Sequence, residues 1–197
     1  MQEGAVVLRN VDLRMNTQDY VVVLGDAGAG KSTMAMCIMR AIYPVSGSID
    51  ISNINVNTLN YAALRKYVGL VPSRPILFTG SLLANLDPGG HLLHSEILPL
   101  LHAVGLIEDN VRVMPHSMKL MIEDTDRVSS TVKQLICLCR VLLRKPQLLI
   151  LDEFSSSIDG RRIKQIDRFL AMQDQFAVLQ LSRNFQHVQV SARADAR

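Results

Sequence analysis

Apolar runs and helical patterns alternate along the chain, and their order predicts its secondary structure. Residues 20–24 (YVVVL) are a β-branched apolar run that ends at Gly25, and a helical pattern continues from Lys31 to about Ile42. Further strands are predicted at 49–51, 67–71, 148–151 and 177–181, and further helices at 132–143 and 159–172. Because strands alternate with helices, we predict an α/β fold built on a parallel sheet with flanking helices.

The stretch from about residue 82 to 122 has a mainly helical pattern. Ile97, Leu100, Leu101 and Val104 follow one another at spacings of three and four, as on one face of a helix. Together with the helix predicted before Pro146, this pattern indicates a helical subdomain over about residues 82–145. A length of 197 residues is typical of one domain, so we expect residues 1–197 to form a single unit.

Composition and charge exclude several classes of protein. Hydrophobic residues make up 48% of the chain and charged residues 20%, which is typical of a globular protein and not of a disordered one. The net charge of +3 is too small and too dispersed to indicate a nucleic-acid partner. No apolar run approaches the roughly 18 residues that a membrane span requires. Cys37, Cys137 and Cys139 lie in apolar stretches, so we expect no disulfide framework.

A glycine-rich segment between the first strand and its helix carries the most specific motif. Residues 25–32 (GDAGAGKS) match G-x-x-x-x-G-K-[ST], the phosphate loop of nucleotide-binding proteins. Glycines let backbone N–H groups point at phosphate oxygens, Lys31 would reach the β and γ phosphates, and the Ser32 hydroxyl would bind Mg²⁺. A chance glycine-rich turn is the alternative, and the position between a strand and a helix argues against it. The predicted nucleotide-binding residues are Gly25, Asp26, Ala27, Gly28, Ala29, Gly30, Lys31, Ser32 and Thr33.

An acidic pair follows a buried strand about 120 residues downstream of the loop. Residues 148–151 (LLIL) end at Asp152 and Glu153, at the carboxyl edge of the predicted sheet, where α/β proteins bind their ligands. We predict that Asp152 holds Mg²⁺ through water and that Glu153 orients or deprotonates an attacking water, the general-base role in phosphoryl transfer. A helix-capping pair is the alternative, and the upstream phosphate loop favours the catalytic assignment.

These motifs and the segments around them resemble the nucleotide-binding domain of ATP-binding cassette (ABC) transporters over nearly the whole chain. Residues 156–159 (SSID) match the D-loop, which in this family crosses to an opposite cassette. Residues 85–88 (NLDP) and 134–140 (QLICLCR) are most similar to the second cassette of the multidrug-resistance-associated (C) subfamily. The other matching segments are 7–11, which resembles the strand before the phosphate loop, 46–49, 64–65, 68–72 and 75–81. The resemblance implies a P-loop NTPase fold, with a RecA-like parallel sheet, flanking helices and a helical subdomain.

The chain departs from the family in three motifs. Ser73 stands where the family has the Gln-loop glutamine, and Arg183 stands where it has the switch histidine. In the signature segment 128–132 (VSSTV), Thr131 replaces a glycine and Val132 a glutamine. A β-branched side chain at position 131 is expected to obstruct the approach of the backbone to the γ-phosphate of ATP on the other cassette. Arginine is a permanent cation and cannot act as a near-neutral proton partner.

The resemblance implies a domain that binds Mg-ATP to power an ABC-type membrane transporter. It also implies head-to-tail pairing with a second ATP-binding cassette, and attachment to the cytoplasmic face of a membrane through transmembrane domains outside this chain. Relative to the family, the chain begins after the aromatic residue that stacks on adenine and ends soon after the switch segment, so we expect a cassette truncated at both ends. We expect no nucleic-acid partner.

Two alternatives stay open at this point. A degenerate cassette would bind nucleotide as a regulatory or structural half-site with little hydrolysis of its own; Ser73, Thr131 and Arg183 favour this alternative, and Glu153 opposes it. An ATPase of DNA repair or chromosome maintenance would carry long coiled-coil arms between the Gln loop and the signature. Only about 55 residues without heptads separate Ser73 from the signature segment, which disfavours this second alternative.

Overall fold

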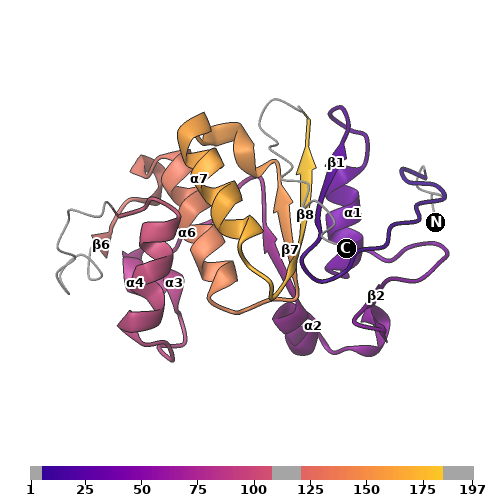
Figure 1. Cartoon of the computed structure of the whole chain (residues 1–197), viewed down its shortest axis with the longest axis horizontal. Coiled ribbons are helices and arrows are strands. Elements are labelled where there is room, and N and C mark those ends of the chain that lie inside the picture. Colours follow the sequence, from indigo (N-terminus) through magenta and orange to yellow (C-terminus); the bar gives the residue numbers. More distant parts are fainter. Residues whose placement is uncertain (1–5, 108–120, 184–197) are drawn as a thin grey trace, which may run out of the picture.

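A parallel sheet of four strands forms the centre of the molecule, in the order β1–β8–β7–β4 (Figure 1). The computed structural model describes residues 6–107 and 121–183 of the chain. In spatial order the strands are Tyr20–Leu24, Ala177–Ser182, Leu148–Asp152 and Val68–Val71. The spatial order differs from the chain order, and each parallel neighbour is reached through a crossover connection. The predicted α/β fold on a parallel sheet is confirmed.

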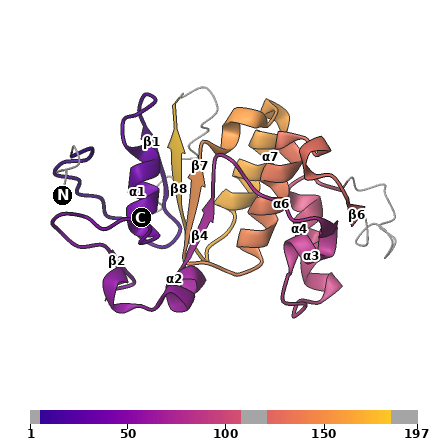
Figure 2. The same ribbon diagram turned by 180° about the vertical axis from the view of Figure 1, so that it is seen from behind.

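Helices cover both faces of this sheet, as Figures 1 and 2 show from opposite sides. Helices α1 (Lys31–Ile38) and α2 (Tyr61–Tyr67) lie on one face, and α6 (Ser130–Leu142) and α7 (Gly160–Ala171) lie on the other. Strand β7 therefore contributes to two hydrophobic clusters. Leu149 and Leu151 pack in the cluster of α6 and α7, and Ile150 packs in that of α1 and α2. Because side chains alternate along a strand, burial on both faces requires an apolar residue at each position, which the run LLIL provides.

Shorter elements surround this framework. Helices α3 (Leu82–Leu86) and α4 (His94–Ala103) lie in the segment predicted as helical, of which residues 108–120 are outside the described residues. No helix within the described ranges is long and apolar enough to cross a bilayer. The remaining short elements are β2 (Asp50–Ile51), β3 (Ile54–Asn55), β5 (Gly80–Ser81), β6 (Met121–Ile122) and the 3₁₀ turns η1 (Val56–Thr58), η2 (Thr125–Arg127) and η3 (Phe154–Ser157).

Helix α1 begins without a side-chain cap, unlike several other helices. Asn60, Ser81, Ser129 and Asp159 each accept a hydrogen bond from a backbone N–H of the helix that follows them. Helix α1 instead follows Gly30, and no side chain caps it. The first N–H groups of a helix have no partner within the helix, so the uncapped start of α1 leaves hydrogen-bond donors for a ligand.

Two predicted elements differ from the structure. The helix expected to continue to about Ile42 ends at Ile38, and Arg40 takes a left-handed φ of 54° that a continuing helix does not allow. The segment 7–11, which the family resemblance identified as a strand, has no strand pairing, and its Val11 side chain is 54% exposed. A strand is stabilised by backbone partners, and none is found for this segment among the residues that the structure describes.

Candidate phosphate-binding site

The predicted phosphate loop connects the end of β1 to the start of α1, at the carboxyl edge of the sheet. Gly28 and Gly30 take left-handed φ values of 84° and 93°. Gly30 is also enclosed, because a Cβ atom there would lie 2.7 Å from Leu8 Cδ2 and 2.9 Å from Val7 Cγ1. The backbone conformation and the close approach of residues 7 and 8 therefore both favour glycine at position 30.

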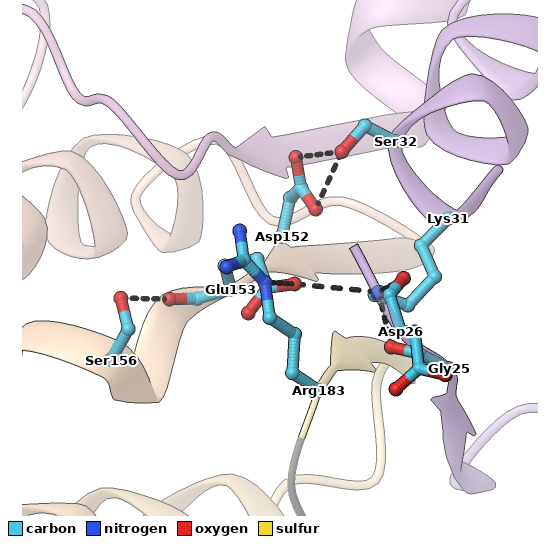
Figure 3. A network of polar contacts seen from close by, with 8 residues as sticks. All are labelled: Gly25, Asp26, Lys31, Ser32, Asp152, Glu153, Ser156 and Arg183. Atoms are coloured by element: carbon cyan, nitrogen blue, oxygen red, sulfur yellow. Dashed lines mark hydrogen bonds and ion pairs between the residues drawn. The ribbon is translucent and has the colours of Figure 1, made fainter. Parts of the chain in front are cut away.

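Lys31 folds back over this loop. Its Nζ donates hydrogen bonds to the carbonyl oxygens of Gly25 (2.5 Å) and Asp26 (2.9 Å), and it lies 3.5 Å from Oε1 of Glu153 (Figure 3). Lys31 is only 8% exposed. A buried ammonium group needs such partners, since removing a charge from water without compensation is costly. The cation is thus held at the loop, where an anionic group would meet it.

Ser32 and Asp152 come together from distant parts of the sequence. The Ser32 hydroxyl lies 2.9 Å from Oδ2 and 3.1 Å from Oδ1 of Asp152, which ends β7 and is 6% exposed. Burial raises the pKa of Asp152, and the hydrogen bond from Ser32 partly opposes this rise. A hydroxyl and a carboxylate are oxygen ligands of the kind that Mg²⁺ prefers, so this pair fits a magnesium ion.

Glu153 has an unusual backbone. Its φ of 50° is left-handed, its N–H donates to the carbonyl oxygen of Leu181 (2.9 Å), and its own carbonyl accepts from the Ser156 hydroxyl (2.8 Å). A left-handed conformation is uncommon outside glycine and persists where the surrounding bonds fix it. The Glu153 side chain points towards Lys31 at the phosphate loop (Figure 3).

The structure also shows a contact that the sequence did not predict. Arg183, at the position of the switch histidine, places its Nε 3.0 Å from Oε1 of Glu153. The register of the sheet explains this pair, because Asp152 lies opposite Leu181 in the parallel ladder of β7 and β8. The residues just beyond both strand ends are therefore neighbours. Sequence alone gives only the opposite charges, since the register depends on how the strands pair.

The hydrogen bonds of the signature segment do not involve the phosphate loop. Ser129 caps α6 by accepting from the Val132 N–H (3.3 Å), and the Thr131 hydroxyl donates to the carbonyl oxygen of Ser157 (2.5 Å) in the D-loop. In the described residues no hydrogen bond or ion pair joins segment 128–132 to residues 25–33. The predicted obstruction of a second cassette by Thr131 stays a prediction.

Ser73 is exposed, and a buried glutamine fixes the backbone of its loop. Gln134 Nε2 on α6 donates to the carbonyl oxygens of Pro72 (3.3 Å) and Ser73 (3.2 Å). The loop after β4 is thus attached to α6 through its main chain. The sequence reasoning did not identify this role of Gln134.

A glycine-rich loop between a parallel strand and an uncapped helix, with a lysine and a serine beside a strand-end aspartate, is the arrangement found in P-loop α/β proteins. The sequence profile described as "ABC transporter" matches residues 8–156. The chain therefore belongs to the ABC transporter family.

Individual relatives agree with this family. ABC transporter C family member 15 of Dictyostelium discoideum is 37% identical over 161 residues, which are 80% of this chain and 11% of that protein. ATP-binding cassette sub-family C member 3 of Rattus norvegicus is 35% identical over 157 residues, covering 78% of this chain and 10% of that protein. The chain thus spans about a tenth of the length of these relatives, and the predicted similarity to the C subfamily is confirmed.

The fold agrees with a solved structure as well. A bacterial Atm1-family ABC exporter with ATP bound matches with a TM-score of 0.74 and 23% identity, over 84% of this chain and 30% of that one. This likeness supports the fold alone. The predicted P-loop NTPase fold is confirmed.

Proposed function

We propose that this chain binds Mg-ATP at the phosphate loop and acts as the ATP-binding cassette of a membrane transporter. The observation that carries the proposal is the meeting of Lys31 and Ser32 with Asp152 and Glu153 at one edge of the sheet. ABC cassettes in general use ATP and Mg²⁺, and the arrangement of this site fits both. The relatives' names support the assignment to transport.

Each part of the site has a task in this proposal. The N–H groups at the start of α1, together with residues Gly25 to Thr33, bind the phosphates, and Lys31 reaches the β and γ phosphates. Ser32 would bind Mg²⁺ directly, and Asp152 would do so through water. When bound, the ion neutralises charge that develops on the phosphates. Glu153 orients the attacking water and accepts its proton.

The wider assembly is part of the same proposal. Residues 1–197 would form one cassette, with a helical subdomain over about 82–145. It would pair head to tail with a second cassette. Transmembrane domains outside this chain would hold it at the cytoplasmic face of a membrane. Nucleic acid is not proposed as a partner.

A degenerate half-site is the second candidate. Two contacts favour it: Arg183 pairs with the proposed base Glu153, and Thr131 bonds to the D-loop of its own chain at Ser157. A degenerate half-site would bind Mg-ATP and hydrolyse it slowly. Binding is common to both candidates, so it is the property to test first.

Calorimetric titration of the 197-residue chain with Mg-ATP and Mg-ADP tests the proposal. Replacement Lys31→Ala should weaken binding roughly 10- to 100-fold, because it removes a charge-assisted contact to phosphate. The exposed Lys164 provides the matched control, and Lys164→Ala should bind as the unaltered chain does. Circular dichroism must show both variants folded. Absence of binding at millimolar nucleotide in folded, unaltered protein would contradict the proposal.

A further inference from the structure

One carboxylate oxygen of Glu153 is shared by two cations. Arg183 Nε lies 3.0 Å and Lys31 Nζ 3.5 Å from Oε1 (Figure 3). The side chains of Lys31 and Glu153 are 7% and 13% exposed, whereas that of Arg183 is 60% exposed. Arg183 therefore closes the buried pair on its solvent side. We propose that Arg183 is a positioning residue that restrains Glu153 against the lysine of the phosphate loop when no nucleotide is bound.

The backbone supports this restraint from both strands. Glu153 is fixed through its N–H to Leu181 and through its carbonyl to Ser156. Arg183 follows β8, whose last residue Ser182 accepts a hydrogen bond from the N–H of Gly25 (3.2 Å). The end of β8 is thus tied to the phosphate loop on one side and to Glu153 on the other. Arg183 reaches Glu153 from a fixed starting point.

The restraint has a chemical consequence, which rests on the proposed function. For hydrolysis, a water oxygen bonds to the γ-phosphorus, the bond to ADP breaks, and the water proton passes to Glu153. Arg183 already donates a hydrogen bond to Oε1 of Glu153, and Lys31 lies beside the same oxygen, so a water must displace Arg183 before it can donate to this oxygen. A bound phosphate would compete with Glu153 for Lys31, but Arg183 keeps its charge at all physiological pH values. Arg183 therefore slows the proton transfer while leaving the phosphate loop free to bind.

Replacing Arg183 separates this restraint from a direct role in phosphate binding. In the 197-residue chain at saturating Mg-ATP, Arg183→Gln should release phosphate roughly 3- to 10-fold faster, the range for a partly exposed charge-assisted contact. The affinity for Mg-ATP should change less than 3-fold. Arg183→Lys should release phosphate at a rate between those of Arg183→Gln and the unaltered chain, since it keeps the charge but loses the planar guanidinium. Arg161, exposed on α7 and without an ion pair in the described residues, provides the control Arg161→Gln, which should leave the rate unchanged.

A rate in Arg183→Gln no higher than in the unaltered chain, with zero in both included, overturns the proposal. A large loss of affinity also overturns it, because Arg183 would then serve the phosphate directly.

A measurement without nucleotide tests the pair independently of the proposed function. The shifts in unfolding midpoint for Arg183→Gln, Glu153→Gln and the double variant should be non-additive if the two side chains interact. Additive shifts overturn the restraint even where the chain binds Mg-ATP. Non-additive shifts in a chain that binds no nucleotide would leave the ion pair in place and contradict the proposed function alone.

Discussion

The hydroxyl of Ser32 contacts both carboxylate oxygens of Asp152, although the two residues are 120 positions apart in the sequence. The contact joins the first turn of α1 to the end of β7. It exists because the parallel sheet brings the carboxyl ends of its strands to one edge, where the phosphate loop also begins. An α/β fold of this kind therefore assembles the proposed magnesium ligands as a direct result of its topology.

The raised pKa of Asp152 predicts how magnesium-dependent binding varies with pH. A carboxylate must lose its proton to assist a metal, and burial makes this loss occur at a higher pH than for an exposed aspartate. The Mg²⁺-dependent gain in ATP affinity should therefore fall as the pH is lowered, and the fall should begin at a higher pH than an exposed aspartate would give. Asp152→Asn should lack this gain at every pH. Titrations with and without Mg²⁺ check this, and the asparagine variant corrects for protonation of the nucleotide itself.

The same burial predicts that Asp152 lowers the stability of the nucleotide-free protein. A raised pKa means that the folded state prefers the neutral carboxyl, so stability falls as the pH rises through the titration. Asp152→Asn should raise the unfolding temperature by a few degrees at pH 7.5, because the amide still accepts a bond from Ser32 without a buried charge. Thermal unfolding without nucleotide measures this, and a lower temperature for the variant would contradict it.

The half-buried Asp167 predicts a stability effect away from the site. The Tyr20 hydroxyl lies 2.6 Å from Gln180 Oε1 and 3.1 Å from Asp167 Oδ1, and burial raises the pKa of Asp167 to about 6. The unfolded value is about 3.9, so the folded state binds more protons between these values, and stability should fall as the pH rises from about 4 to 6. Asp167→Asn should remove this loss, a gain of about 1 kcal/mol at pH 7 after allowance for screening by water.

Urea unfolding at pH 4.5, 5.5 and 7 tests the assignment. The difference in free energy of unfolding between Asp167→Asn and the unaltered chain should grow across this series. The exposed Asp174 provides the control Asp174→Asn for the exchange of one carboxylate for an amide. A constant difference for Asp167→Asn would show that its titration is not linked to folding.

Close packing of β4 against α6 predicts a strong effect of one added methyl group. A Cβ atom at Gly69 would overlap Val141 Cγ1 and press on Pro146. Gly69→Ala should therefore cost about 1–3 kcal/mol of stability, as overpacking of a core does. Gly160→Ala is the control, since a Cβ atom at Gly160 meets nothing within 4 Å. Equal stabilities of the two variants would contradict the packing argument.

The sequence predicted those parts of the molecule that depend on local pattern. The strands at 20–24 and 148–151 were found because an apolar run bounded by a glycine or an acidic pair has few other interpretations. The positions of Lys31, Ser32 and Asp152 followed from the motif and from the rule that ligands meet at the carboxyl edge of a parallel sheet. For these residues, the local sequence motif and the topology of the sheet lead to the same prediction.

Features that depend on contacts between distant segments were not predicted. The pair of Arg183 and Glu153 needs the register of β7 with β8, and the bond from Thr131 to Ser157 needs the packing of α6 on η3. Helix α2 was missed because it is short, and its start depends on a cap at Asn60 more than on hydrophobic periodicity. The segment 7–11 has the composition of a strand, but strand formation is decided by a partner and not by composition alone.

The signature segment predicts how the chain behaves towards a second cassette. Thr131 places a branched side chain at the start of α6, and its hydroxyl is committed to Ser157. If the side chain blocks a backbone donor from the γ-phosphate across the interface, the loss is on the order of 100-fold in rate, as for one preorganised donor. With ATP, the chain carrying only Glu153→Gln, which prevents turnover, should sediment as a monomer, because the branched side chain of Thr131 would obstruct the approach of a second cassette.

Restoring the family's residues should reverse this behaviour. Thr131→Gly with Val132→Gln should allow ATP-dependent pairing and raise steady-state phosphate release by about 100-fold. Thr131→Ser with Val132→Gln is the informative control: it keeps the hydroxyl that bonds Ser157 but removes the branching methyl, so a gain confined to the glycine variant points to backbone approach and not to bulk at the methyl position. Sedimentation is measured in the Glu153→Gln background, and phosphate release is measured in chains that keep Glu153. Rapid release from the unaltered chain, or no gain in a double variant that does pair, would show that position 131 does not limit the chemistry.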